Sequence, residues 1–192
     1  MNEILADMSE NNAMDTITDT DAVLMLSVSK GDDNAFRILV QKWKNPIINY
    51  FFRSTNDAFL SEDLTQQTFI NLYKARASYK VKAKFSTYLF FIARCVLINN
   101  HRSSKPVETV DPSDMESCAV FEDASSAGEL EELFENTIKD MPENQRTAIL
   151  LLKQQQLSYD EIAGAMSASV GAVKTWIHRA RETLRKAFKE YE

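Results

Sequence analysis

The chain has 192 residues, of which 44% are hydrophobic, enough for one or two small apolar cores. Glycine and proline occur only four times each, against a usual combined share of roughly 12%, so a mostly helical chain is expected. The longest apolar stretch, 88–98, is interrupted by Arg94 and is far shorter than the roughly 20 residues that span a bilayer. The first twelve residues carry three acids and no base, unlike a secretory signal, so we expect a cytoplasmic protein without membrane insertion.

The cysteines and histidines form no metal-binding pattern. Cys95 and Cys118 lack CxxC spacing and a neighbouring histidine, and the sequence holds only two histidines, His101 and His178. We therefore expect no metal site, no disulfide framework, no cofactor and no catalytic residue. Cys95 is interpreted as a small buried apolar side chain.

The net charge of −6 is unevenly distributed along the chain. Residues 1–19 carry −5, residues 20–105 carry +7, residues 106–128 carry −6 and residues 129–192 carry −2. Because salt screens charges beyond about 8–10 Å, each segment presents its own field. This division predicts an acidic N-terminal tail, a first helical domain, a flexible acidic linker and a second helical domain, in that order.

Apolar residues at helical spacing predict three helices in the first domain. The first covers 33–51, with an aspartate as its cap, and Pro46 is expected to kink it or to mark a join because proline lacks an amide donor. The second is expected to begin with Ser61 as its N-cap and to run through 61–79. The third covers 86–102.

The stretch 74–105 holds eight bases and no acid, interleaved with aromatic residues. Positive charge attracts phosphates, and aromatic faces stack on unpaired bases. The stretch therefore has the composition of a nucleic-acid surface. An equally simple interpretation is a solvated basic face with its aromatic residues in the core.

The second domain carries a helix-turn-helix pattern. Helical spacing at 130–138 and beyond Met141-Pro142 precedes a capping box, in which the Ser158 hydroxyl and the Glu161 carboxylate satisfy amides at a helix start. A short turn at 167–169 leads into a longer helix with a basic outer side, as in a recognition helix.

Two pairs of motifs in these domains resemble one family. They are EDLTQQTFINLY (62–73) with FSTYLFFIAR (85–94), and LSYDEIA (157–163) with VGAVKTWIHRAR (170–181). In this order and at this spacing they resemble bacterial RNA polymerase sigma factors of the extracytoplasmic-function (ECF) type, within the sigma-70 family. The resemblance covers about residues 20–105 and 129–189. It implies an all-α protein of two small helical domains that binds core RNA polymerase, recognises promoter DNA and promotes strand opening.

The resemblance also implies a role for particular side chains. Those expected to contact core polymerase are Asp63, Gln66, Asn71 and Lys74. Those expected at the minus-ten element are Tyr79, Lys80, Lys82, Lys84, Tyr88 and Arg94. Those expected at the minus-thirty-five element are Ser169, Ala172, Lys174, Thr175, His178, Arg179, Arg181 and Arg185, with the three arginines on phosphates. An anti-sigma factor is a further expected partner.

The chain departs from the family pattern at several positions, among them Tyr88, Cys95, Asn99 and Trp176. Cys95 stands where the family usually has Asn, Asn99 where it has Asp, and Tyr88 where it has Trp. Trp176 replaces an Arg of the recognition helix, which removes a charge-assisted contact, and is expected to pack. A preferred promoter sequence unlike that of other members is therefore expected.

Two other classes of function compete with this interpretation. A helix-turn-helix regulator with a helical sensing or dimerisation domain would explain 158–189 but would give the basic stretch 74–105 no purpose. An all-helical enzyme would need a convergent set of titratable or metal-binding groups, which the sequence does not suggest. Binding to core polymerase discriminates the sigma-factor hypothesis from both.

Overall fold

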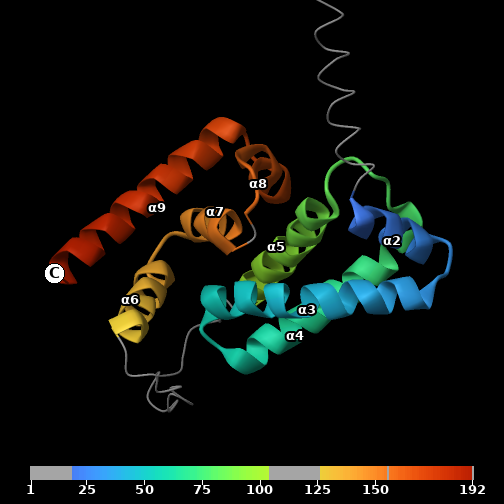
Figure 1. Ribbon diagram of the computed structural model, residues 1–192, viewed down its shortest axis with the longest axis horizontal. Coiled ribbons are helices and arrows are strands. Elements are labelled where there is room, and N and C mark those ends of the chain that lie inside the picture. Colours follow the sequence, from blue (N-terminus) through green and yellow to red (C-terminus); the bar gives the residue numbers. More distant parts are fainter. Residues whose placement is uncertain (1–18, 104–125, 155, 192) are drawn as a thin grey trace, which may run out of the picture.

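The computed structural model describes residues 19–103, 126–154 and 156–191, and this part of the chain is helical and without strands (Figure 1). The all-α fold class is thereby confirmed. The elements in chain order are α2 (Thr20–Ser29), α3 (Asp33–Thr55), α4 (Ala58–Lys74), the 3-10 turn η1 (Arg76–Ser78), α5 (Phe85–Ser103), α6 (Ser126–Lys139), α7 (Glu143–Gln154), α8 (Tyr159–Met166) and α9 (Val170–Tyr191). None of these helices is long and apolar enough to cross a membrane.

Helices α2 to α5, here called the first domain, pack around an aromatic core. Tyr50 and Phe90 are almost fully buried, and their rings meet edge to face at 5.7 Å. The Trp43 ring lies 6.1 Å from both Phe85 and Phe90, which joins α3 to α5. Since burying one large apolar side chain is worth roughly 1.5–3 kcal/mol, this cluster holds the two helices together.

Helix α3 runs without a break through Pro46, so the predicted join is not present. Asp32 caps its start by accepting a hydrogen bond from the amide of Ala35 at 3.0 Å. Leu39, before the proline, and Ile47, after it, are both fully buried in the same core. Packing on both sides therefore outweighs the cost of roughly 3 kcal/mol that a proline imposes within a helix.

The predicted N-cap of the second helix is wrong by four residues. Helix α4 begins at Ala58, and Asp57 is its N-cap, accepting from the amide of Leu60 at 3.0 Å. Ser61 instead lies inside the helix, fully buried, where its hydroxyl donates to the carbonyl of Asp57. Both residues are good caps, and burial of Ser61 decides between them.

Two further boundaries differ from the prediction. Helix α2 lies in a segment for which the sequence pattern predicted no helix, and its N-cap is Asp19, the last residue of the predicted acidic tail. Helix α6 begins at Ser126, inside the predicted linker 106–128. The rest of both segments, 1–18 and 104–125, lies outside the described residues.

Helices α6 to α9 form the second domain, in which α9 packs on α6, α7 and α8. The capping box is present: the Ser158 amide donates to the Glu161 carboxylate at 2.7 Å, and the Glu161 amide donates to the Ser158 hydroxyl at 3.3 Å. Helix α8 ends at Ser167, which is left-handed (φ 51°) and turns the chain into α9. The helix-turn-helix is therefore present as expected.

The two domains pack against each other, chiefly through α5 and α8 (Figure 1). The helices approach closely at Gly164, where an added Cβ would lie 3.1 Å from the methyl group of Thr87. Arg146 of α7 donates to the carbonyl of Ser54 in α3 at 2.6 Å. Side chains of the second domain thus cover one side of the first.

Candidate polymerase and promoter interfaces

Helix α4 separates a buried face from an exposed polar face. Leu64, Phe69 and Leu72 point into the core, as expected. The expected polymerase contacts Asp63, Gln66 and Lys74 are exposed. Asn71 is half-buried, and its side-chain oxygen accepts a hydrogen bond from Gln67 at 2.8 Å.

Sequence reasoning missed two apolar side chains on α4. Phe59 is 85% exposed and Ile70 is 46% exposed. Both lie on α4, as Asp63 and Gln66 do. The exposed face of α4 is therefore not purely polar: Phe59 lies in the first turn of the helix and Ile70 lies towards its C-terminal end. The sequence alone hides this signal, because an isolated Phe at a helix start is more often a core residue.

The loop between η1 and α5 has a buried stem and an exposed apex. Tyr79, at the start, is only 8% exposed, and its ring packs on Tyr88 at 5.2 Å. Burial, aided by the negative charge of Asp19, raises the pKa of the Tyr79 phenol to about 12. Phe85, at the end, is fully buried, whereas residues 80–84 between them are all exposed.

The expected minus-ten residues are therefore not equivalent. Lys80 and Lys82 are exposed on the apex, while Tyr79 is part of the stem and offers no open ring face. Tyr88 is half-buried beside it. The burial of Tyr79 distinguishes it from the exposed lysines of the apex, and its expected contact with a base remains a prediction.

Two of the expected minus-ten residues, Lys84 and Arg94, make contacts with side chains of the second domain. The Lys84 ammonium forms an ion pair with the Glu161 carboxylate at 2.9 Å. The Arg94 guanidinium donates to the side-chain oxygen of Asn144 at 3.2 Å. Burial alone would raise the pKa of Glu161, but hydrogen bonds from Ser158 and the charge of Lys84 lower it. The pair is therefore ionised at neutral pH.

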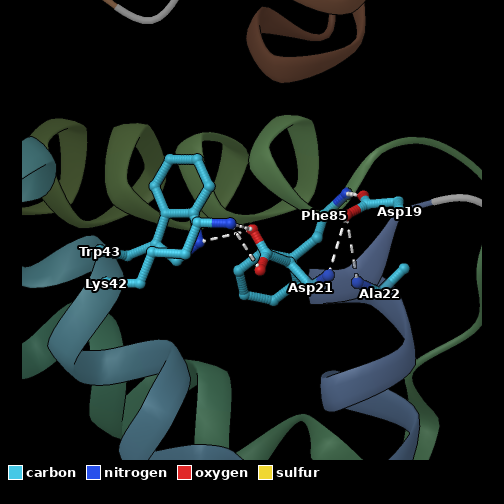
Figure 2. A network of polar contacts seen from close by, with 6 residues as sticks. All are labelled: Asp19, Asp21, Ala22, Lys42, Trp43 and Phe85. Carbon is cyan, nitrogen blue, oxygen red and sulfur yellow. Dashed lines mark hydrogen bonds and ion pairs between the residues drawn. The ribbon is translucent and has the colours of Figure 1, made fainter.

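A buried carboxylate joins α2 to α3 (Figure 2). Asp21 is buried, and its carboxylate accepts a hydrogen bond from the Trp43 indole at 3.0 Å and pairs with Lys42 at 2.6 Å. A buried carboxylate is stable only when such partners replace its lost hydration. Trp43 is thereby fixed against Phe85, the first residue of α5.

The outer face of α9 is open along its length. Ala172 is half-buried, and the other expected minus-thirty-five residues are exposed: Ser169, Lys174, Thr175, His178, Arg179, Arg181 and Arg185. The Ser169 hydroxyl accepts from the amide of Ala172 at 3.2 Å, so it also serves the helix start. Val173, Ile177 and Ala180 are buried on the opposite face.

Three residues that depart from the family pattern have defined surroundings. Trp176 is half-buried and packs against the core, as expected for a packing residue. Asn99 is exposed, and Cys95 is half-buried rather than buried as predicted. Within the described part of the chain, histidine, cysteine and acidic residues form no cluster of three that could hold a metal ion.

A helical domain with an exposed basic loop, followed by a helix-turn-helix with an open basic face, defines a two-domain DNA-binding protein. Comparison with known families extends this class. The family description "Sigma-70 region 2" matches residues 39–106, and "Sigma-70, region 4" matches residues 131–184.

Relatives of known function match most of the chain. It is 33% identical to the ECF RNA polymerase sigma factor SigW of Bacillus subtilis (strain 168) over 175 residues, covering 85% of this chain and 94% of the relative. It is 32% identical to the ECF RNA polymerase sigma-E factor of Escherichia coli (strain K12) over 177 residues, covering 86% and 92%. The chain belongs to the sigma-70 family, as a sigma factor of the ECF type.

Solved structures share the fold. CnrH, in complex with the cytosolic domain of CnrY, has a TM-score of 0.69 at 21% identity, covering 90% of this chain and 99% of its own. The sigma factor RpoE of Bartonella quintana, in complex with the anti-sigma factor NepR, has a TM-score of 0.62 at 19% identity, covering 80% and 96%.

Membership in this family decides between the functions considered above. The protein is an alternative sigma factor that binds core RNA polymerase and promoter DNA for transcription initiation. It is not an enzyme, and a regulator with a separate sensing domain is not favoured, because region 2 occupies the place of such a domain.

Proposed function

We propose that this sigma factor divides initiation among three surfaces. The polar face of α4 docks on core polymerase, the loop 79–84 captures the separated minus-ten strand, and α9 reads the minus-thirty-five element. In terms of family regions, residues 20–105 act as region 2 and residues 129–192 as region 4, joined by the linker 106–128 and preceded by the acidic tail 1–19. The observation that carries the proposal is the exposed lysine apex on a buried aromatic stem.

On α4 the docking residues are Asp63, Gln66, Asn71 and Lys74, with Phe59 and Ile70 added as apolar anchors. Phe59 is 85% exposed and lies on the same helix as the exposed Ile70, so the two could anchor a partner. Interfaces commonly combine such an aromatic anchor with a polar surround. The mixture on α4 fits a protein partner better than it fits DNA, since Asp63 would repel phosphates.

At the minus-ten element, opening the duplex requires energy. Exposing one base costs a few kcal/mol of unstacking, and cationic side chains beside the displaced strand offset part of this cost. Lys80, Lys82 and Lys84 are the exposed cations of the apex, Lys84 also pairing with Glu161, and Tyr88 and Arg94 lie at its border. The lysines are the main contacts, and Tyr79 supports them from below.

At the minus-thirty-five element, Lys174 and Thr175 lie within the first two turns of α9, where a recognition helix reaches base edges. Arg179, Arg181 and Arg185 lie further along and hold phosphates. Ser169, Ala172 and His178 complete the contact face.

Binding both elements requires the two domains to separate. The names of the elements place them about 25 base pairs apart, roughly 85 Å at about 3.4 Å per base pair. In the compact arrangement Lys84 and Glu161 are 2.9 Å apart, so the two DNA-binding parts cannot reach both elements together. Residues 104–125 join the domains and reach at most about 75 Å when extended, which with the domains' own widths suffices.

An anti-sigma factor is proposed as a further partner, acting on the compact form in the cytoplasm. NepR is named as an anti-sigma factor in the complex with RpoE of Bartonella quintana, and CnrH was solved with the cytosolic domain of CnrY. The same fold here gives such a partner two packed domains to hold together.

Transcription in vitro from a genomic fragment library, with core polymerase alone or with this protein added, tests the proposal. New start sites that depend on the protein, and that share two spaced sequence elements, are the expected result. Equal transcription with and without the protein would contradict the proposed function.

A further inference from the structure

Asp19 lies where the starts of α2 and α5 meet (Figure 2). Its Oδ1 accepts hydrogen bonds from the amides of Asp21 at 3.0 Å and Ala22 at 3.4 Å, which caps α2. Its Oδ2 accepts a hydrogen bond from the amide of Phe85 at 2.6 Å. One carboxylate therefore satisfies amide donors at the starts of α2 and α5, and uses both of its oxygens to do so.

The C-terminal end of the loop 79–84 lies beside this carboxylate. Phe85 directly follows the loop, and its amide is bound by Asp19. Tyr79 begins the loop, and the charge of Asp19 acts on its phenol. Lys80 and Lys82 project from the exposed segment between these two fixed points.

We propose that Asp19 is a positioning residue for promoter opening, which fixes the stem of the loop so that Lys80 and Lys82 meet the separated strand in one geometry. This inference rests on the proposed function of the loop. A loop with a fixed stem has already lost the conformational entropy that a free loop would lose on binding. The positive end of the α5 dipole favours a carboxylate at this place.

Substitution of Asp19 separates this role from simple helix capping. Asparagine is as good an N-cap as aspartate, but it has one acceptor oxygen, so Asp19→Asn caps α2 and loses the bond to Phe85. Asp19→Ala loses both. Asp32→Ala is the matched control, because Asp32 caps α3 through one amide at the other end of α2 and lies away from the loop.

The measurement is permanganate reactivity of unpaired thymines in complexes of full-length protein, core polymerase and promoter, all at saturating concentration. Core-polymerase affinity and thermal unfolding are measured alongside. We expect Asp19→Asn to bind polymerase as the original protein does and to lower the unfolding temperature no more than Asp32→Ala does, with open complexes reduced about fivefold, the factor that one lost cap interaction represents. Asp32→Ala is expected to lower the unfolding temperature and leave opening unchanged.

Two outcomes would overturn the inference. Either Asp19→Asn and Asp19→Ala open DNA normally, or Asp32→Ala reduces opening as much as they do. The variant Lys80→Ala with Lys82→Ala separates the inference from the proposed function on which it rests. If this lysine variant opens DNA normally, the role of the loop is wrong; if it fails to open DNA while both Asp19 variants succeed, only the inference about Asp19 is wrong.

Discussion

The two surfaces that we propose to bind DNA in this sigma factor are built in different ways. The recognition face of α9 lies on one helix, and all but one of its expected contact residues are exposed. The loop 79–84 depends on partners from distant segments: Asp19 binds its end, Tyr88 packs on its start, and Glu161 pairs with Lys84. Under the roles proposed above, reading a duplex uses a stable helix surface, whereas opening one uses a loop whose shape the rest of the domain maintains.

The largest expected effect concerns the core behind the loop. Phe90→Ala should destabilise the first domain by about 3–5 kcal/mol, because Phe90 is almost fully buried between Trp43 and Tyr50. Phe91→Ala is the matched control, since the neighbouring side chain is 37% exposed. Urea unfolding followed by tryptophan fluorescence measures both. Equal losses from the two substitutions would show that the aromatic cluster does not hold α5 in place.

The next largest effect is expected from substitutions on the docking face of α4. Phe59→Ala combined with Gln66→Ala should weaken binding to core polymerase by about 2 kcal/mol or more, roughly a thirtyfold loss, if the exposed phenylalanine is an interface anchor. Helix content should not change, because both side chains are exposed on α4. Gln41→Ala, an exposed residue of α3, is the control in a titration with labelled core enzyme. Unchanged affinity of the double variant would place the docking face elsewhere.

Substitutions on α9 should affect reading without affecting opening. Lys174→Ala and Thr175→Ala should each lower discrimination at the upstream element by about 1–3 kcal/mol, the worth of one good base contact. Gel-shift titration of the holoenzyme on promoters with altered upstream elements measures this, with Lys153→Ala of α7 as a control. The assignment fails if the preference for the upstream sequence survives both substitutions.

The contact between the domains gives the smallest effect. Ionised Glu161 pairs with Lys84, and its pKa lies below the usual 4.5, so its stabilising contribution is complete above about that pH and is lost as the pH falls through the lowered value. An ion pair this exposed is worth about 0.2–1 kcal/mol. Glu161→Gln keeps an acceptor oxygen for the capping box and removes the charge.

Small-angle scattering across this pH range measures how compact the chain is. The original protein should expand slightly on acidification, and the Gln variant should already be expanded at neutral pH. If the two proteins have the same radius of gyration at neutral pH, the ion pair does not contribute to the compact arrangement.

The sequence predicted the local features of the second domain better than the surroundings of the loop 79–84. The capping box at Ser158 and the buried face of α9 were predicted correctly, because caps and helical periodicity are local signals. The start of α4 was misplaced because Asp57 and Ser61 are both good caps, and only tertiary burial distinguishes them.

The surroundings of the loop were not predictable from the sequence. Tyr79 lies in a basic stretch of the sequence, yet its ring is buried against Tyr88, and Lys84 and Arg94 contact residues of the other domain. Asp19 is the last residue of an acidic segment that the sequence predicts to be a tail. Its hydrogen bond from the amide of Phe85 joins residues 66 positions apart in the sequence. No local pattern encodes such contacts, so they become visible only in the folded chain.

The central claim is that the exposed lysines of the loop open DNA and do not merely bind it. Permanganate footprinting of Lys80→Ala with Lys82→Ala, at holoenzyme concentrations that saturate the promoter, tests it most directly. The account predicts normal closed complexes by gel shift and few reactive thymines at the minus-ten element. Wild-type thymine reactivity in the saturated complex would contradict it and leave the basic apex as a solvated surface.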